Sequence, residues 1–548
     1  MPSFVLGPLL RYVGETEAVF WVETDAPCEV EVLGARERTW RVCGHDYALV
    51  CANGLEPGTW HEYEVRLDGE RVWPEPASEF PPSAFRTYPK EGALQVVFGS
   101  CRVAAPHEPP YSLRKDDDER GREIDALHTM AIRMRDDPRE DWPDVLLMLG
   151  DQVYADEVSP ATAAFVESRR HPDEAPGDHV LDFEEYAHLY RESWSDPALR
   201  WLFSTVSTAM IFDDHDVHDD WNISQSWLDD ARSHHWWNEH IVGALMSYWV
   251  YQHLGNLAPE AHRDDQLLAR VREADDGADV LREFAVRIDR GTSGSRWSYC
   301  RDIGNTRLVV IDSRAGRVLE EGRRSMVDEQ EWAWVEEHVT GGFDHLLIGT
   351  SLPWLLGLGM HYVEAWSEAV AGGAWGRRGR KLGEWARRTF DLESWAAFQG
   401  SFARLGELQR AVGAGERGEA PASIVTLSGD VHHAYLFEVS FPGEMGVRSA
   451  VYQGVCSPYR NPLDAKERRV FRLAVTRPFA VAARALARAA GVKDPQIDWR
   501  LAGGGPWFDN QVATLTINGR RIDMRLDRAV PTDGTHARLD RVLQRRLA

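Results

Sequence analysis

The stretch from Val145 to Asp156 constrains the fold of this chain more than any other. Its first five residues are apolar, which is enough for one buried strand, and the run stops abruptly at Gly150 and Asp151. A buried strand that ends on Gly-Asp places a carboxylate at the carboxyl edge of a sheet, where open α/β folds bind their ligands. The sequence therefore predicts a functional site at this edge.

Other apolar runs end on residues of the kinds that bind metal ions. The runs over 96–99, 209–212 and 424–428 are followed by Cys101, by Asp213 to Asp216, and by Asp430 and His432. Core packing alone does not account for four such strand ends, so we expect a two-metal hydrolase with Asp151 as the carboxylate shared by both ions. The thiol of Cys101 and the phenol of Tyr154 would suit trivalent iron.

The order of expected elements divides the chain into three parts. A chain of 548 residues is too long for one core. Residues 1–88 have the short β-rich runs and turns of a small immunoglobulin-like or fibronectin-like sandwich, with about seven strands. Residues 93–460 alternate strands and helices, as in a layered α/β sandwich, and 355–391 reads as an insertion or lid. Residues 461–548 are expected to form a helix, a hairpin and a loose tail or short surface helix that pack on the catalytic domain.

Composition restricts the function and the setting. A formal net charge of −25 argues against nucleic-acid binding as the main role. The six cysteines show no CxxC pair or disulfide framework, which favours reduced thiols. Neither a signal peptide nor a run long enough for a transmembrane helix is found in the sequence, and we expect a cytoplasmic protein.

The segment over 466–490 is basic and amphipathic. It allows two interpretations, a helix that docks on a membrane surface or a helix that covers the domain and exposes its arginines to solvent. We favour the covering helix, and peripheral membrane contact is the weaker alternative. The oligomeric state is left open.

Five sequence motifs together resemble the PhoD-like alkaline phosphatases, which belong to the calcineurin-like metallophosphoesterases. The motifs are found in the family's order between residues 93 and 460: Gly99 to Cys101, Gly150 to Tyr154, Asp213 to Trp221, Ile311 to Arg314 and Gly429 to His432. The resemblance implies a four-layer αββα sandwich preceded by a small all-β domain. It also implies a phosphomonoesterase or phosphodiesterase that hydrolyses a small phosphate ester.

The resemblance further implies a set of metal ligands. A ferric ion would be held by Cys101, Asp151, Tyr154 and His432. A second ion, Ca²⁺ or alternatively Zn²⁺, Mn²⁺ or Mg²⁺, would be held by Asp151, Asp430 and one acid of the 213–214 pair, with Asp214 the better match.

Three more residues receive catalytic roles by the resemblance. His215 matches the superfamily histidine that protonates the leaving group, and a histidine beside a bound phosphate is placed to act as a general acid. Arg102 or Arg314 would clamp the phosphate through two parallel hydrogen bonds.

Ordinary structural roles compete with these assignments. Asp151 could cap a helix, and Cys101 and Tyr154 could be core residues. Two other functions also stay open. One is a phospholipase D-type phosphodiesterase that acts at membranes, and the other is a non-catalytic binding protein with a vestigial site.

Overall fold

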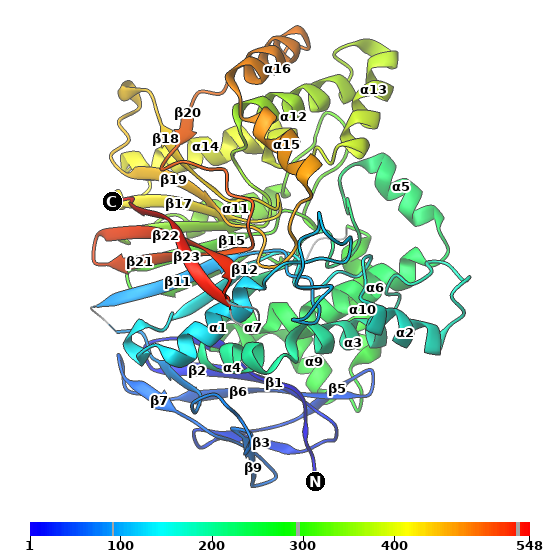
Figure 1. Ribbon diagram of the computed structural model, residues 1–548, viewed down its shortest axis with the longest axis vertical. Coiled ribbons are helices and arrows are strands. Elements are labelled where there is room, and N and C mark those ends of the chain that lie inside the picture. Colours follow the sequence, from blue (N-terminus) through cyan, green and yellow to red (C-terminus); the bar gives the residue numbers. More distant parts are fainter. Residues whose placement is uncertain (90–91, 292–295, 533–536) are drawn as a thin grey trace.

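A computed structural model of the protein describes residues 1–89, 92–291, 296–532 and 537–548 (Figure 1). Residues 4–86 form a small all-β unit, as the sequence predicts, although with ten short strands instead of about seven. One sheet has the order β1 (Phe4–Val13), β2 (Glu17–Thr24), β6 (His45–Asn53) and β5 (Trp40–Val42). The other has the order β4 (Ala35–Arg38), β3 (Glu29–Val32), β8 (Val65–Leu67) and β9 (Glu70–Trp73), and β7 (Trp60–Glu62) pairs with β10 (Ala84–Arg86).

Two mixed sheets form the centre of the rest of the chain. The first has the order β13 (Ser207–Ile211), β12 (Val145–Leu149), β11 (Ala93–Gly99), β21 (Gln511–Asn518), β22 (Arg521–Pro531) and β23 (Ala537–Arg546). The second has the order β14 (Tyr299–Ile303), β15 (Thr306–Ile311), β16 (His345–Thr350), β17 (Ser423–Ser428), β19 (Ala450–Val455), β18 (Tyr435–Ser440) and β20 (Asp498–Leu501).

The two sheets pack face to face. A Cβ on Gly454 of β19 would lie 3.2 Å from Met524 of β22 and 3.3 Å from Phe98 of β11, so the sheets touch at this glycine. Apolar side chains of both sheets, among them Leu147 and Val425, share one buried core. This packing agrees with the layered α/β class expected from the alternating elements.

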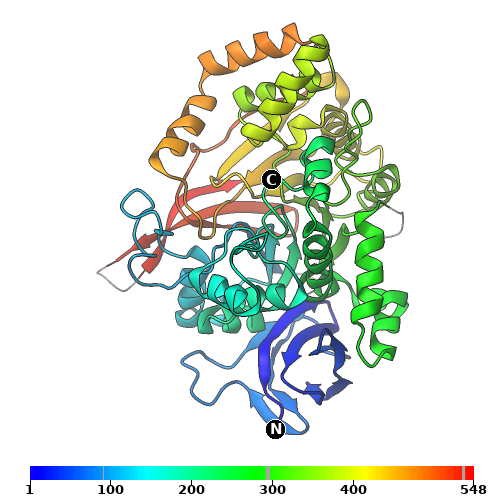
Figure 2. The same ribbon diagram turned by 90° about the vertical axis from the view of Figure 1, so that its right-hand side faces the viewer.

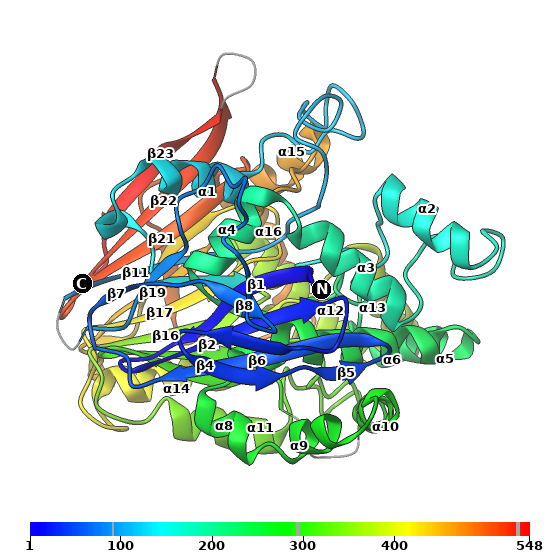
Figure 3. The ribbon, with the colours of Figure 1, turned by 90° about the horizontal axis from the view of Figure 1, so that it is seen from below.

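Helices cover the outer faces. On the first sheet lie α1 (Ala126–Asp136) and α4 (Pro197–Thr205), whereas α11 (Glu329–His338) and α14 (Gln399–Ala414) cover the second. Near the strand ends lie α2 (Pro160–Arg169), α3 (Phe183–Trp194), α5 (Gln225–Ser233) and α6 (Trp237–Ser247), and α6 continues into a π-helix over Tyr248–His253 and α7 (Leu254–Asn256). The short helices α8 (Pro259–Asp264), α9 (Gln266–Glu273) and α10 (Ala278–Asp289) follow. Figure 3 shows the N-terminal strands across the lower end of the molecule.

Two segments differ from the simple expectations. The insertion 355–391 forms α12 (Leu358–Ala371) and α13 (Gly376–Thr389), and the expected tail forms strand β23, paired along its length with β22. The residues of this strand are mostly exposed or half-buried, so the sequence has no clear apolar alternation that would predict a strand. Pairing with β22 stabilises it as a strand. The segment 466–490 folds as α15 (Ala465–Ala474) and α16 (Arg477–Ala489), which lie with α13 at the end opposite the N-terminus (Figures 1 and 2). Among the described residues, none of the helices has the length and apolar character needed to span a bilayer.

Candidate metal centre

The register of parallel strands brings the predicted loops together. Gly99 of β11 is aligned with Met148 of β12, and Leu149 is aligned with Ile211 of β13. The loops that follow these strands therefore leave the same edge of the first sheet. Gly429, which follows β17 of the second sheet, meets them there, because a Cβ at this glycine would lie 2.1 Å from the Ser100 hydroxyl.

A first group of ligand-type atoms comes from three of these loops. Ligand atoms of Cys101, Asp151 and His432 all lie within 4.8 Å of one another, and Cys101 Sγ is 3.2 Å from Asp151 Oδ2. Tyr154 Oη is 3.5 Å from the same carboxylate oxygen and accepts a hydrogen bond from Asn461 Nδ2 at 3.1 Å. The four residues that the resemblance assigns to one ion are thus neighbours around one point.

A second group lies beside the first and shares one of its members. Carboxylate oxygens of Asp151, Asp213 and Asp214 are within 4.8 Å of one another, and all three side chains are buried. Asp430 Oδ1 lies 3.9 Å from Arg314 Nη2, which in turn is 3.0 Å from Asp214 Oδ1. Asp151 belongs to both groups, as a carboxylate between two ions would.

The backbone at this edge adopts an uncommon conformation at several candidate ligands. The φ angle is +57° at Cys101, +49° at Asp151, +65° at Asp430 and +49° at His432. Non-glycine residues rarely adopt the left-handed region, and such residues cluster at functional sites. Gly150 has φ +105°, and a Cβ there would lie 2.6 Å from Asp213 Cβ, so only glycine fits between these acids.

The buried acids carry more negative charge than their protein neighbours balance. Within the described residues, Asp151 Oδ1 and Asp213 Oδ2 are buried without a hydrogen-bond partner. Burial, reinforced by the charges of Asp214 and Asp213, raises the pKa of Asp151 well above its ordinary value. Burial and the charges of Asp213 and Asp214 likewise raise the pKa of Asp430. Unpaired buried carboxylate oxygens are costly unless a cation meets them, so this donor set fits metal ions.

The other donors fit the same reading. Burial lowers the pKa of His432 to about 3, which keeps a lone pair on the imidazole for a metal. Burial and the nearby carboxylates of Asp151 and Asp430 raise the pKa of the Cys101 thiol well above its usual value. A bound cation reverses that shift, since metal ligation deprotonates a thiol.

His215 lies at the rim of the second group. Its Nδ1 is 2.9 Å from Asp156 Oδ1, and its Nε2 is 3.8 Å from Asp219 Oδ1. Burial opposes the charged form, but the carboxylate of Asp156 overrides it and raises the pKa of His215 well above the ordinary value. The raised pKa favours the doubly protonated imidazole, which donates from Nδ1 to Asp156, whereas Nε2 has no hydrogen-bond partner among the described residues, since Asp219 at 3.8 Å is too distant.

The two arginines expected to clamp a phosphate make other contacts. Arg314 is fully buried, donates from Nε to Asp213 and forms an ion pair with Glu393. Arg102 forms an ion pair with Asp125 at 2.8 Å and donates to the carbonyl of Ser193. Both guanidinium groups therefore form ion pairs with buried acids, and their role as a phosphate clamp stays a prediction.

Sequence reasoning overlooked residues that contribute to this site. Asp156 orients His215 and lies within the stretch 145–156, so its position just after Tyr154 was a usable signal. Glu393 is the other residue that was overlooked, and it shares Arg314 with Asp213 and Asp214, the pair named from the sequence. No motif surrounds Glu393, and only long-range packing brings it here. In contrast, the ring nitrogens of His240 lie 2.6 Å and 2.7 Å from the carbonyl oxygens of Val180 and Val217, which accept hydrogen bonds from the ring, as around a core histidine.

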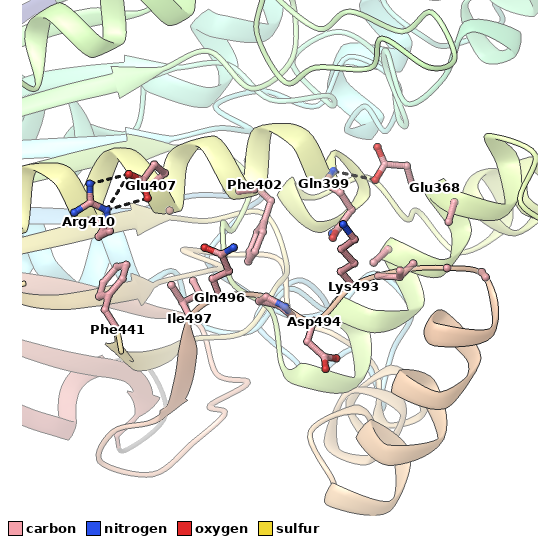
Figure 4. A pocket seen from close by; sticks show the side chains of 18 of the residues that line it. Glu368, Gln399, Phe402, Glu407, Arg410, Phe441, Lys493, Asp494, Gln496 and Ile497 are labelled. Atoms are coloured by element: carbon pink, nitrogen blue, oxygen red, sulfur yellow. Dashed lines mark hydrogen bonds and ion pairs between the residues drawn. The ribbon is translucent and has the colours of Figure 1, made fainter. Parts of the chain in front are cut away.

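A separate cleft of about 730 Å³ lies away from this centre (Figure 4). It is lined by residues of α12, α14 and the segment 490–497, including Glu368, Phe402 and Lys493. None of the predicted site residues lines it. The strand-edge loops, and not this cleft, hold the candidate chemistry.

Comparisons with known proteins agree with this fold. Residues 129–272 match the sequence model of the family described as "PhoD-like phosphatase", and residues 1–85 match "Domain of unknown function (DUF7800)". The solved "Structure of PhoD" matches with a TM-score of 0.59 at 12% identity, covering 100% of this chain and 92% of that chain. The structure of purple acid phosphatase PPD1 from yellow lupin (Lupinus luteus) seeds gives a TM-score of 0.45 at 11% identity, covering 96% and 72% of the two chains.

No curated protein sequence matches the chain. The family match includes Asp151, Tyr154 and the Asp213 to Asp216 cluster, and the structural match extends over the whole chain. The sequence match to the PhoD-like phosphatases thus covers residues 129–272, and the chain as a whole shares the fold of the solved PhoD structure.

Proposed function

We propose that this protein is a metal-dependent hydrolase of phosphate esters, a phosphomonoesterase or phosphodiesterase with a dinuclear centre. The observation that carries the proposal is the shared position of Asp151 in two adjacent groups of buried ligand-type atoms. The match of residues 129–272 to PhoD-like phosphatases supports the same reaction class.

Each group suits a different ion. Cys101, Asp151, Tyr154 and His432 offer thiolate, carboxylate, phenolate and imidazole donors, a set that suits Fe³⁺. Asp151, Asp430 and Asp213 or Asp214 offer only carboxylates, which suit Ca²⁺ or another hard divalent ion. When bound, the two ions supply the Lewis acidity that activates water and a phosphoryl oxygen.

The protein's own side chains do the remaining work. His215 keeps a proton on the nitrogen turned away from Asp156, so it can protonate the departing ester oxygen. Asp156 fixes the orientation of that ring. Arg314 neutralises Asp213 and Glu393 and thereby holds the acid cluster in place when no substrate is bound.

The test measures metal content and turnover on the same sample. We expect iron and a divalent ion in the purified protein, hydrolysis of p-nitrophenyl phosphate or bis(p-nitrophenyl) phosphate, and loss of activity on chelation that metal addition restores. Tyr154→Phe should abolish a visible tyrosinate-to-iron absorption band. Equal turnover before and after complete metal removal contradicts the proposal, as does full metal loading without turnover on either ester.

A further inference from the structure

Helix α16 is packed with its small residues inward and its large aliphatic residues outward. Ala483 and Ala487 are buried against Tyr362 of α12. Val481, on the side opposite the alanines, is 69% exposed, and Leu486, on a flank of the helix, is 40% exposed. A helix that only covers a domain normally turns its larger apolar side chains toward the core. A covering role, as expected from the sequence, therefore explains why the alanines are buried but does not explain why the larger aliphatic side chains are exposed.

Helix α15 also exposes aliphatic side chains, although an aromatic ring packs on its inner side. Phe471 packs inward, with its ring 4.9 Å from that of His433, which is the residue after the candidate ligand His432. Val470 and Leu473 point outward and are 62% and 58% exposed. The two helices thus expose aliphatic side chains in succession, next to the loop that carries the candidate centre.

The charge of this segment is opposite to that of the protein. Residues 465–493 contain eight basic residues and one acidic residue, whereas the chain carries a net charge of −25. In the part of the chain that the structure describes, the exposed side chains of Arg469 and Arg477 form no ion pair or hydrogen bond. Arg484 and Arg488 share a single carboxylate, that of Asp494. Positive charge therefore remains unbalanced around the exposed aliphatic residues.

Helix α13 extends the same end of the molecule. The indole of Trp375, just before α13, donates to the carbonyl of Ala489 at the end of α16, at 3.2 Å. Both helices pack on α12, and Figure 2 shows them together at the end remote from the N-terminal strands. Trp385 and Phe390 are 56% and 58% exposed, and basic residues also dominate this helix.

We propose that the outer face of α15 and α16, hereafter the apical face, docks on the surface of an anionic lipid bilayer. Aliphatic side chains flanked by arginines suit the boundary between lipid headgroups and acyl chains, and basic residues near that surface are attracted to anionic lipids. A second copy of the chain fits less well, because a two-fold contact through this face would bring unpaired arginines together. The proposal does not rest on the hydrolase activity proposed above.

The experiment is co-sedimentation of the full chain with vesicles of phosphatidylcholine alone or with added phosphatidylglycerol. Binding is expected only with phosphatidylglycerol and should weaken as salt screens the charges. Two variants, Arg469→Glu/Arg477→Glu and Val470→Asp/Leu473→Asp/Val481→Asp, should each lower the partition coefficient roughly tenfold or more. The matched controls, Arg38→Glu/Arg71→Glu and Leu33→Asp, change exposed residues of the N-terminal strands and should bind as the unaltered protein does.

Turnover of a small soluble phosphate ester, or the unfolding temperature where no turnover is found, verifies that each variant is folded. Failure of the unaltered protein to bind phosphatidylglycerol vesicles overturns the proposal. Equal binding by the apical-face variants and the controls also overturns it. A dimer in light scattering that these variants dissociate, without vesicle binding, would show that a second copy occupies the face instead.

Discussion

Two histidines of this protein lie between carboxylates, and only one of them belongs to the candidate centre. His45 Nδ1 is 2.8 Å from Glu23 and Nε2 is 2.7 Å from Glu184, so it joins the N-terminal sheet to α3. His215 Nδ1 is 2.9 Å from Asp156, but its Nε2 is 3.8 Å from the nearest acid, which is too long for a hydrogen bond.

The direction of the pKa shift alone does not distinguish His45 from His215. Burial opposes the charged form of both rings, yet the hydrogen bonds to Glu184 and Glu23 raise the pKa of His45 to about 9, and Asp156 raises the pKa of His215 well above its ordinary value. The difference is that both nitrogens of His45 are engaged, whereas His215 keeps one proton free beside the buried acids. A raised histidine pKa therefore indicates a catalytic role only where one ring nitrogen is free to transfer its proton to a substrate.

The substitution with the largest expected effect tests whether the acids beside His215 form a catalytic metal centre. Asp151→Asn removes the carboxylate that both ligand groups share. Phosphate-ester turnover should fall by at least about a thousandfold, more than the 10–100-fold loss typical of residues outside the ligand set. Metal content by elemental analysis should fall with it. Glu23→Gln, which changes the acid beside His45, is the control and should keep both the metal and the activity.

Replacing His215 tests the free proton directly. His215→Asn should lower turnover of phenyl phosphate by about 10²–10⁴-fold, the usual contribution of a general acid. The loss on p-nitrophenyl phosphate should be much smaller, because p-nitrophenolate departs without a proton. Equal losses on the two esters would mean that His215 acts in some other way.

Asp156→Asn should give a weaker version of the same pattern. Asp156 positions the ring of His215 and also accepts a hydrogen bond from the backbone of Asp219. We expect a loss of about 10–100-fold on phenyl phosphate, as for residues that orient a functional group. If turnover of phenyl phosphate and of p-nitrophenyl phosphate falls equally, Asp156 stabilises only the loop, and its hydrogen bond to His215 does not contribute to catalysis.

The smallest effect concerns His45 and appears in stability, not in activity. Since its pKa is raised from 6.5 to about 9 in the folded protein, its contribution is complete below pH 6.5 and is lost as the pH rises toward 9. His45→Gln should lower the free energy of unfolding by about 1–2 kcal/mol at pH 6, a value reduced for the solvent exposure of Glu184. The deficit should shrink by pH 9.

Denaturant titrations at the two pH values measure this change, with the exposed His235→Gln as control. A deficit that stays constant with pH would show that the ion pairs of His45 contribute nothing beyond packing. Loss of turnover in His45→Gln at pH 6 would remove the distinction between the two histidines.

The sequence by itself determined the strand ends and the kinds of atoms they deliver. Runs of apolar residues that stop at Gly150, Ser100 and Gly429 predict buried strands. The acids, thiol and histidine that follow these runs are residue types that bind metal ions. The family motifs added which donors belong together, and those assignments remain proposals to be tested by the experiments above. The layered α/β class follows from the same periodicity.

Only the tertiary structure decided how these groups meet. Parallel register and sheet packing bring Asp151 next to Asp213 and His432, whose distances along the chain carry no such information. Long-range packing also engages Arg102 and Arg314 in ion pairs, pairs β23 with β22, and turns the aliphatic side of α16 outward. Local patterns specify which face of an element is apolar, but the partner that covers a face or satisfies a charge comes from elsewhere in the chain.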